Sequence, residues 1–425
     1  MIKTLTILGG GSAYAPGLLA ALIHHEARLD LAEVRLWDID AEHLEIVTAL
    51  GKAMARARLA RFIVTRAASL EEALDGTDVV LNSTRPGGFA ARRVDETLPV
   101  ELGIPGQETV GPGGFFFALR SVPEALRLRA ILRKQSPSAW LLNYTNPTNI
   151  VTQALRAAGD DRVLGLCDQS EGDLETLREA LGKQGPVRFG SVGTNHATWY
   201  ADLHFGEASV QSFPARIEEY RSVAHHDEEH RLRFTHSVEL AQKCPGYWPN
   251  SYLPYYTHPQ TFVAHSRAHG PRTDAIVAKL PFYYGHFREE AKKAIPELRH
   301  HRGTSGFGDM AVEVLAGLIR RDGQRLVLNV SNGNTMPEFK KDTVVEATVE
   351  IGPRGPRTLP SPRYPAAFLE LGQRIEAYQR EAARAIALGS EADQLAALAQ
   401  NPLIPSPAVA KELWDKAKER YAATR

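Results

Sequence analysis

The chain begins with a short strand-like run that ends in a cluster of glycines. Residues 4–8 (TLTIL) are β-branched and apolar, as in a buried strand, and an apolar helix begins near Pro16. The turn between them holds Gly9, Gly10, Gly11 and Ser12. Glycines let the backbone approach a pyrophosphate, which the N-terminus of a helix binds through its free N–H groups. This order predicts a dinucleotide site, although Tyr14 replaces the third glycine of the GxGxxG pattern.

A second predicted strand ends in Asp38, 27 residues after Gly11. At about this distance an acidic residue binds the adenosine ribose in dinucleotide-binding folds, and an acid there favours NAD over NADP. Asp38 is therefore a cofactor-binding candidate. It is also placed to cap a helix that begins near Ala41, and the sequence leaves both interpretations open.

Strands and helices alternate through the first half of the chain. Strand-like runs at residues 61–65, 78–83, 140–144 and 162–166 are interspersed with helical segments. This alternation predicts an α/β fold with a Rossmann-like, doubly wound parallel sheet. Because 425 residues exceed one typical domain and no flexible linker is visible, we expect two intimately packed units. These are a NAD-binding domain at residues 1–195 and an α+β domain at residues 196–425 that binds substrate and metal.

Polar residues follow the strand at residues 140–144, at the edge where open α/β sheets bind ligands. We predict that Asn143 and Asn146 contact the cofactor and that Asn146 also contacts the substrate, although asparagines here also fit a simple turn. Two glycine-rich segments, residues 85–92 and 105–115, are predicted loops that close over a ligand. Arg85 is the cofactor candidate and Arg92 the substrate candidate, with solvated surface arginines as the alternative.

A cysteine and a histidine that suit a metal site lie farther along the chain. Cys167 ends the run VLGLC, beside Asp168, and His196 lies in SVGTNHATWY. A thiolate and an imidazole suit Zn, Mn, Fe or Co, and two protein ligands leave positions open for substrate oxygens. The alternative is a buried free cysteine and a histidine bonded within a turn, which is the commoner situation for an isolated pair.

Composition restricts the partners and the compartment. Lys+Arg and Asp+Glu both number 50, so no global charge attracts nucleic acid or an acidic membrane, and a small-molecule ligand is expected. The two cysteines make no disulfide framework, and a metal-binding thiolate needs a reducing compartment. No apolar window is long enough for a membrane span. We therefore expect a soluble, cytoplasmic protein without nucleic-acid or membrane partners.

Together these segments resemble the glycoside hydrolases of family four. The motifs occur in order from residue 8 to about residue 350, and they are GGGSAYAP, DID, RPGG…R, GQETVGPGG, NYTNP, GLCD and NHATW. The family includes 6-phospho-α- and 6-phospho-β-glucosidases, α-galactosidases and α-glucuronidases. The resemblance implies a fold similar to that of lactate and malate dehydrogenases. It also implies two cofactors, NAD and a divalent metal that is usually Mn²⁺.

The resemblance implies a redox-neutral hydrolysis of an O-glycosidic bond. In the family, NAD⁺ transiently oxidises C3 of the sugar, the metal stabilises the product of C2 deprotonation, the C1 leaving group is eliminated, and water adds before the hydride returns. Cys167 and His196 match the metal ligands, and Tyr252, the first tyrosine of SYLPYY, matches the base. Asp168 matches a position that is aspartate in the 6-phospho-α-glucosidases, where an acid protonates an α-linked leaving group.

Some residues depart from the family's pattern. Gln169-Ser170 replace a usual Met-Pro or Val-Pro, and Ala90 replaces a common glutamate. Arg272 matches a basic stretch that implies substrate phosphate binding, but Asp274 stands where a second arginine is usual and is expected to repel a phosphate. The leading prediction is a 6-phospho-α-glucosidase-like enzyme. The alternatives within the family are a 6-phospho-β-glucosidase and a hydrolase of unphosphorylated α-glycosides.

The second half of the chain has fewer motifs. We predict a solvated helix at residues 207–242, an aromatic, proline-broken loop at residues 251–256, and C-terminal helices from Pro365 that pack on the core and contribute to a homodimer or homotetramer. Histidines and an acid in the charged stretch also fit a second metal site, although a solvated face is favoured: His225, His226, Asp227 and His230. By resemblance, the segment around Arg302 lies near the active site, and Asn329 and Asn332 approach the substrate.

Two other functional classes compete with a glycosidase. A NAD-dependent 2-hydroxy-acid dehydrogenase is supported by the fold alone, and it would need a catalytic histidine backed by an aspartate but no Cys167. A nucleotide-binding regulatory protein without catalysis is the other class. The joint presence of Cys167, His196 and Tyr252 disfavours it.

Overall fold

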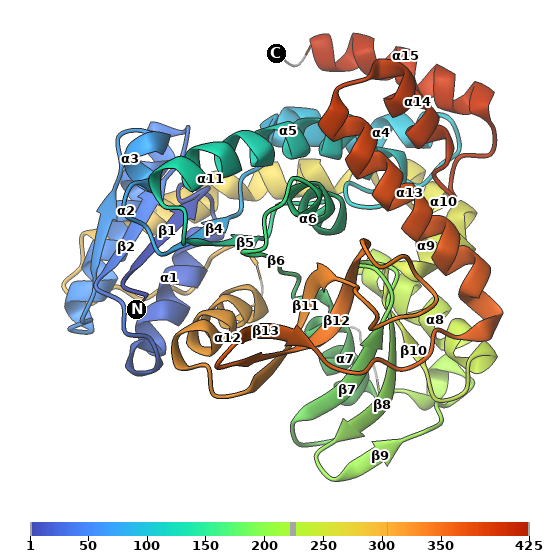
Figure 1. Cartoon of the computed structure of the whole chain (residues 1–425), viewed down its shortest axis with the longest axis horizontal. Helices are drawn as coiled ribbons and strands as arrows, with labels where there is room; N and C mark the ends of the chain where they lie inside the picture. The colour runs from blue at the N-terminus through green and yellow to red at the C-terminus, as the bar shows by residue number, and fades with distance from the viewer. Residues whose placement is uncertain (1, 222–226, 304, 424–425) are drawn as a thin grey trace.

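A single large sheet forms the centre of the molecule. In the computed structural model, which describes residues 2–221, 227–303 and 305–423, this sheet has nine strands in the order β13-β12-β11-β6-β5-β4-β1-β2-β3 (Figure 1). The parallel strands are β1 (Thr4–Leu8), β2 (Glu33–Trp37), β3 (Ile63–Arg66), β4 (Val79–Asn82), β5 (Trp140–Asn143) and β6 (Val163–Gly165). Their order, β3-β2-β1-β4-β5-β6, is that of the doubly wound dinucleotide-binding fold, so this prediction is confirmed.

Helices cover both faces of this sheet. One face packs against α1 (Ala15–His24), α2 (Ala41–Ala57), α11 (Arg272–Ala291) and α12 (Ser305–Arg320). The other packs against α3 (Leu70–Leu74), α4 (Gly88–Glu101), α5 (Gly111–Gln135), α6 (Thr148–Ala157), α13 (Leu369–Leu388), α14 (Glu391–Ala399) and α15 (Pro407–Ala422). Strands such as β4 are buried along their whole length because both of their faces are covered. The predicted C-terminal helices do pack on the core, over α4, α5 and α6 (Figure 1).

The C-terminal half extends the same sheet. Strand β11 (Gln324–Ser331) runs antiparallel to β6, with Asn329 opposite Gly165, and β12 (Val344–Gly352) and β13 (Gly355–Thr358) continue the sheet beyond it. The two halves therefore share one core, as expected. The division at residues 195 and 196 stays a prediction.

A smaller antiparallel sheet lies beside the large one. It contains β7 (Val187–Val192), β8 (Trp199–Phe205), β9 (Ala208–Val210) and β10 (Trp248–Pro249). Apolar side chains of α7 (Gln169–Ala180) and α8 (Glu228–Lys243) pack against it. The short α9 (Leu253–Thr257) and α10 (Pro259–His269) follow β10. These elements confirm the expected α+β character of the second half.

Two segments predicted as loops are partly helical. Helix α4 begins at Gly88 and α5 begins at Gly111, so both glycine-rich segments form helix N-termini. A Cβ atom on Gly113 would lie 2.3 Å from the carbonyl oxygen of Gln107. At this position in α5 glycine's poor helix propensity is overridden, because the backbones pack too closely for any side chain. The predicted loop at residues 251–256 is likewise wrong in part, since α9 begins at Leu253.

The predicted helix at residues 207–242 is wrong over its first part. That segment contains β9 and a short 3₁₀ helix, Ile217–Glu219, and α8 begins only at Glu228. Pro214 interrupts the helical pattern, and the Asp227 carboxylate caps α8 by accepting a hydrogen bond from the backbone N–H of His230 at 2.8 Å. His225 and His226 lie outside the described residues. Along the described part of the chain, none of the helices has the length and apolarity that a membrane crossing requires.

Substitution of Gly165 tests the junction of the two halves. A Cβ atom there would lie 2.5 Å from Thr152 Oγ1 and 2.7 Å from Asn329 Cβ, so we expect Gly165→Ala to push β11 away from β6 and to destabilise the fold by about 1–3 kcal/mol. Gly285, inside α11, has no neighbouring atom within 4 Å of the added Cβ, so Gly285→Ala should stabilise by about 0.5–1 kcal/mol. Denaturant midpoints measure both. Equal midpoints for the two variants would show that the junction is not tightly packed.

Candidate active site

A cavity of about 1580 Å³ opens at the carboxyl ends of the parallel strands. It lies over the point between β1 and β4 where the strand order reverses, which is where doubly wound sheets bind ligands. Its lining includes most of the predicted site residues: Gly9, Gly11, Ser12, Asp38, Arg85, Arg92, Asn146, Cys167, Asp168, His196, Tyr252 and Arg272. Four predicted site residues do not line it: Gly10, Asn143, Asn329 and Asn332. One cavity thus brings together residues from both halves of the chain.

The glycine turn after β1 is held in shape by Asp38. Gly9 has a φ of 83°, in the region that favours glycine, and the Asp38 carboxylate accepts the backbone N–H groups of Gly11 at 2.9 Å and Asp40 at 3.0 Å. The cap of α2 is Asp40, which accepts the N–H of His43 at 3.0 Å. The interpretation of Asp38 as this cap is therefore wrong. Burial raises the pKa of Asp38.

The two asparagines after β5 have different environments. Asn143 is buried beneath the cavity, where its amide donates to the carbonyl of Thr145 at 3.0 Å and accepts from the Asn82 amide at 3.1 Å. Asn146 lines the cavity, and its side-chain oxygen accepts from the backbone N–H of Thr148 at 3.2 Å. Asn143 thus supports the turn from below, and Asn146 is the one that a ligand can contact.

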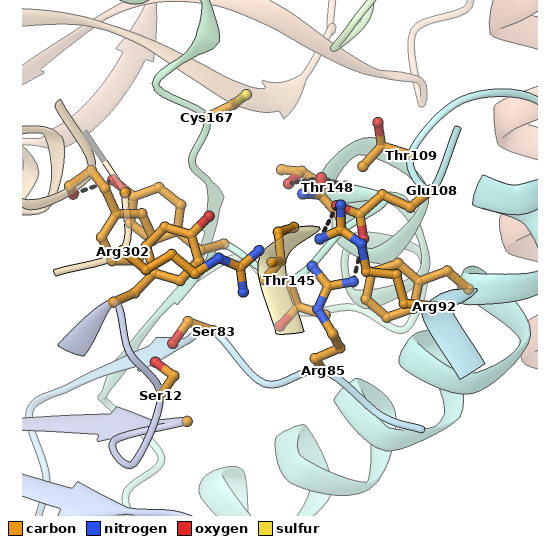
Figure 2. A pocket seen from close by; sticks show the side chains of 18 of the residues that line it. Ser12, Ser83, Arg85, Arg92, Glu108, Thr109, Thr145, Thr148, Cys167 and Arg302 are labelled. Carbon is orange, nitrogen blue, oxygen red and sulfur yellow. Dashed lines mark hydrogen bonds and ion pairs between the residues drawn. The ribbon is translucent and has the colours of Figure 1, made fainter. Parts of the chain in front are cut away.

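The predicted arginines converge on a buried carboxylate. Figure 2 shows Arg85 and Arg92 pointing toward Glu108, which forms ion pairs with both, the one with Arg92 at 2.9 Å. Arg92 also binds Glu96 at 2.7 Å. Burial alone would raise the pKa of Glu108, but the positive charges of Arg85 and Arg92 lower it to about 2. Arg302, from the C-terminal half, lies over the ring of Tyr14 at 4.6 Å in the same cavity.

The thiol of Cys167 and the imidazole of His196 face each other. Cys167 follows β6, and His196 lies in the β7–β8 turn with a φ of 62°; the Sγ–Nε2 distance is 3.5 Å. Burial, with the nearby charges of Glu346 and Asp168, raises the pKa of Cys167 well above its ordinary value. Burial lowers the pKa of His196 to about 3, so its imidazole is neutral. A divalent cation would ionise such a thiol and accept the imidazole lone pair, so the pair fits a metal site.

A hydrogen-bond network supports this pair from below. Glu346, on β12, is almost fully buried and accepts from Asn195 at 2.8 Å, from Thr198 Oγ1 at 2.5 Å and from Ser170 Oγ at 3.2 Å. Asn195 precedes His196 in the chain and bonds to Cys167 as well. The sequence pattern did not mark Glu346 as a site residue. The network ties the β7–β8 turn to the large sheet and so fixes the position of His196.

Tyr252 lies against the metal-binding candidates. It precedes α9, and its ring stacks on that of His196 at 4.0 Å with an angle of 4° between the planes. The guanidinium of Arg233, on α8, lies 5.2 Å from the Tyr252 ring centre. Burial raises the pKa of Tyr252, and Arg233 and Arg272 oppose this rise. Nothing in the charged sequence around Arg233 marked it as a site residue, because its position depends on how α8 packs.

Asp168 and Arg272 complete the lining beside this cluster. Asp168 follows Cys167 at the start of α7, and Arg272 is the first residue of α11. Asp274 lies outside the lining, where Arg93 binds its carboxylate at 2.8 Å. The expectation that Asp274 repels a substrate phosphate is therefore wrong. The cavity thus offers a glycine turn for a dinucleotide, a thiol and imidazole for a metal, and a tyrosine near two arginines for proton transfer.

Comparisons with known proteins agree with this arrangement. The sequence profile of the family 4 glycosyl hydrolases matches residues 4–183, and the profile of the C-terminal domain of that family matches residues 191–404. A maltose-6'-phosphate glucosidase of Clostridium acetobutylicum is 27% identical over 97% of this chain and 96% of its own length. A probable 6-phospho-beta-glucosidase of Bacillus subtilis is 28% identical over 99% of this chain and 97% of its own.

A solved structure is similar over the same extent. The crystal structure of a 6-phospho-alpha-glucosidase from gut microorganisms, in complex with NAD and Mn²⁺, superposes with a TM-score of 0.90 at 25% identity and covers 100% of this chain and 99% of that one. The matched profiles together span most of the sequence. The chain therefore belongs to family 4 of the glycosyl hydrolases.

Proposed function

We propose that this glycoside hydrolase cleaves 6-phospho-α-glucosides with the help of NAD⁺ and Mn²⁺. The observation that carries the proposal is the placement of Cys167, His196 and Tyr252 in one cavity with a dinucleotide-type glycine turn. Support comes from the similar 6-phospho-alpha-glucosidase, whose structure holds NAD and Mn²⁺. The maltose-6'-phosphate glucosidase of Clostridium acetobutylicum adds support for a phosphorylated α-glucoside.

Each group of residues has a separate task in this proposal. NAD⁺ supplies a hydride acceptor and Mn²⁺ supplies a Lewis acid. The cofactor-binding residues are Gly9, Gly10, Gly11, Ser12, Asp38, Arg85, Asn143 and Asn146, with Asn143 acting through the turn that it supports. Cys167 and His196 hold the metal. Arg92, Asn146 and Arg272 orient the substrate, and Arg272, near Tyr252, binds its phosphate.

The proton transfers fall to Tyr252 and Asp168. Tyr252 acts as the base at C2 of the sugar because Arg233 and Arg272 favour its ionised form. Asp168 protonates the leaving oxygen, since a carboxylic acid beside the metal cysteine can reach an α-linked aglycone. Because the probable 6-phospho-beta-glucosidase of Bacillus subtilis is also similar to this chain, a 6-phospho-β-glucoside is the alternative substrate. An unphosphorylated α-glycoside is the other alternative.

We also propose a domain division, a compartment and an oligomeric state for the enzyme. Residues 1–195 act as the NAD-binding domain and residues 196–425 as the substrate- and metal-binding domain. A metal-binding thiolate at Cys167 favours a reducing compartment, the cytoplasm. The helices after Pro365 contribute to a homodimer or homotetramer.

A panel of p-nitrophenyl glycosides tests the substrate and the cofactors together. With NAD⁺, Mn²⁺ and a thiol present, we expect the α-glucoside with a 6-phosphate to be hydrolysed and the β-linked and unphosphorylated forms to react poorly. Omission of either NAD⁺ or Mn²⁺ should abolish hydrolysis, and no net NADH should form. Hydrolysis without NAD⁺ would exclude the redox route. NADH that accumulates with a 2-hydroxy acid, without glycoside cleavage, would favour a dehydrogenase instead.

Tyr252→Phe tests the base. Loss of the hydroxyl should lower kcat by about 10²–10⁴-fold and should stop exchange of the C2 proton of the substrate with deuterated water, while Mn²⁺ binding persists. Tyr256→Phe is the matched control and should keep near-normal activity, because Tyr256, the fourth residue of α9, lies outside the cavity lining. Unchanged C2 exchange in Tyr252→Phe would assign the base to another residue.

The pH dependence of kcat tests the arginine beside the base. The base must be ionised, and Arg233 lowers the pKa of Tyr252 against the effect of burial. Arg233→Gln should therefore raise that pKa and move the rising limb of the pH profile upward by about 1–3 pH units. Arg272→Gln should act in the same direction, and Arg231→Gln, on the exposed side of α8, should leave the profile unchanged. A profile that does not move in either active-site variant would remove the arginines from this role.

A further inference from the structure

We propose that His236, Glu239 and His258 form a binding site for a divalent transition metal such as Zn²⁺, separate from the Cys167–His196 pair. His236 and Glu239 lie one turn apart on α8, and His258 lies between α9 and α10. His236 Nδ1 and His258 Nε2 both lie 3.1 Å from the same oxygen, Glu239 Oε2. The inference does not depend on the proposed glycosidase activity.

The spacing of the three donor atoms suits a tetrahedral metal. With zinc–ligand bonds of about 2.0–2.1 Å, neighbouring ligand atoms lie roughly 3.3 Å apart. The two 3.1 Å distances are close to this value, and all three donor atoms lie within 4.8 Å of one another. The histidine side chains are 14% and 24% exposed and Glu239 is 50% exposed, so solvent reaches one side of the cluster. Water can supply the remaining ligand there.

Hydrogen bonds around His258 leave the lone pair of its Nε2 atom facing Glu239. Thr257 Oγ1 donates to the carbonyl of Leu253 at 3.4 Å, so it accepts from His258 Nδ1, which lies 2.9 Å away. With the proton on Nδ1, the Nε2 lone pair faces the Glu239 carboxylate. Two acceptors at 3.1 Å need a cation between them, either a proton or a metal. Two imidazoles and one carboxylate favour Zn²⁺, Co²⁺ or Ni²⁺ over Mg²⁺ or Ca²⁺.

A metal at this cluster would brace elements of the active site. Helix α8 also carries Arg233, and the segment that leads to His258 begins at Tyr252. The rings of His236 and His258 stack at 4.0 Å with 14° between their planes, which joins the two segments, and one ring has to turn for both in-plane lone pairs to reach a shared metal. Metal bonds would then replace the stacking across the same junction and hold Arg233 against the Tyr252 ring.

A second cluster on the same helices provides a matched control. Glu228 on α8 and His265 and His269 on α10 also bring donor atoms within 4.8 Å of one another. Their surroundings are more open, because the side chains of His269 and Glu228 are 50% and 52% exposed. We therefore place the metal at the less exposed cluster of His236, Glu239 and His258.

Cobalt uptake by the full-length, metal-stripped protein distinguishes the sites. Co²⁺ bound by Cys167 gives a thiolate charge-transfer band in the near ultraviolet, whereas Co²⁺ bound by histidines and a carboxylate gives only visible d–d bands. We expect the wild type to bind two equivalents and Cys167→Ser to lose one equivalent together with the charge-transfer band. His258→Gln should lose the other equivalent and keep that band, and His269→Gln should keep both.

Thermal unfolding provides a second measurement. Zn²⁺ should raise the unfolding midpoint of Cys167→Ser but not that of the Cys167→Ser/His258→Gln double variant, because only the first retains the proposed site. The proposal is overturned if wild-type and His258→Gln proteins take up equal cobalt, or if the second equivalent is lost in His269→Gln instead. It is also overturned if the wild type takes up cobalt only through the thiolate band. Absence of that band alone would count against the Cys167–His196 metal site and not against this one.

Discussion

The antiparallel contact between β6 and β11 determines how the cysteine and the histidine of the cavity lie relative to each other. Asn329 stands opposite Gly165, two residues before Cys167, and β12 lies next in the sheet. From β12, Glu346 reaches Asn195 and holds the β7–β8 turn that carries His196. A shift at the β6–β11 contact would therefore move the cysteine relative to the histidine. Since metal ligands must be placed within a few tenths of an ångström, the proposed metal site requires a tightly packed junction.

Burial supplies the electrostatic conditions of the cavity. It raises the pKa of Cys167 and of Tyr252 and lowers that of His196, so without other charges the site favours neutral groups. In the proposed reaction, the ionised forms of Cys167 and Tyr252 depend on cations held at fixed places, a metal at the thiol and arginines at the tyrosine. Glu108 shows the converse, because two arginines keep its carboxylate ionised despite burial. The protein thus controls the reactive state of each group through its immediate charged neighbour.

Local sequence patterns predicted those parts of the structure that depend on local physics. The glycine turn and the place of Asp38 in the cavity lining were predictable because strand, turn and helix are adjacent in the chain, and the doubly wound strand order followed from their alternation. The helix N-termini at Gly88 and Gly111 were missed because glycine is a poor helix former, and the close backbone packing around Gly113 in α5 is revealed only by the tertiary structure. The contact of Arg233 with Tyr252 and the support by Glu346 could not be predicted either. The first depends on how α8 packs beside the segment of Tyr252 within the second half, and the second on contact between β12 and the distant β7–β8 turn.

The arginines of the cavity differ in the groups that their positive charges face. Arg92 binds both Glu96 and Glu108, so its charge is offset and its side chain is fixed, as suits a residue that shapes a binding surface. Arg233 and Arg272 instead act on Tyr252. In the proposed reaction these two arginines serve both a substrate phosphate and the ionised tyrosine. Each of these anions needs a positive charge beside it, and two opposite charges 4 Å apart near a protein surface attract each other by about 4 kcal/mol. A phosphate that occupied a single arginine would leave the tyrosine without its cation. A second arginine beside Tyr252 allows the phosphate and the tyrosinate to be stabilised at the same time.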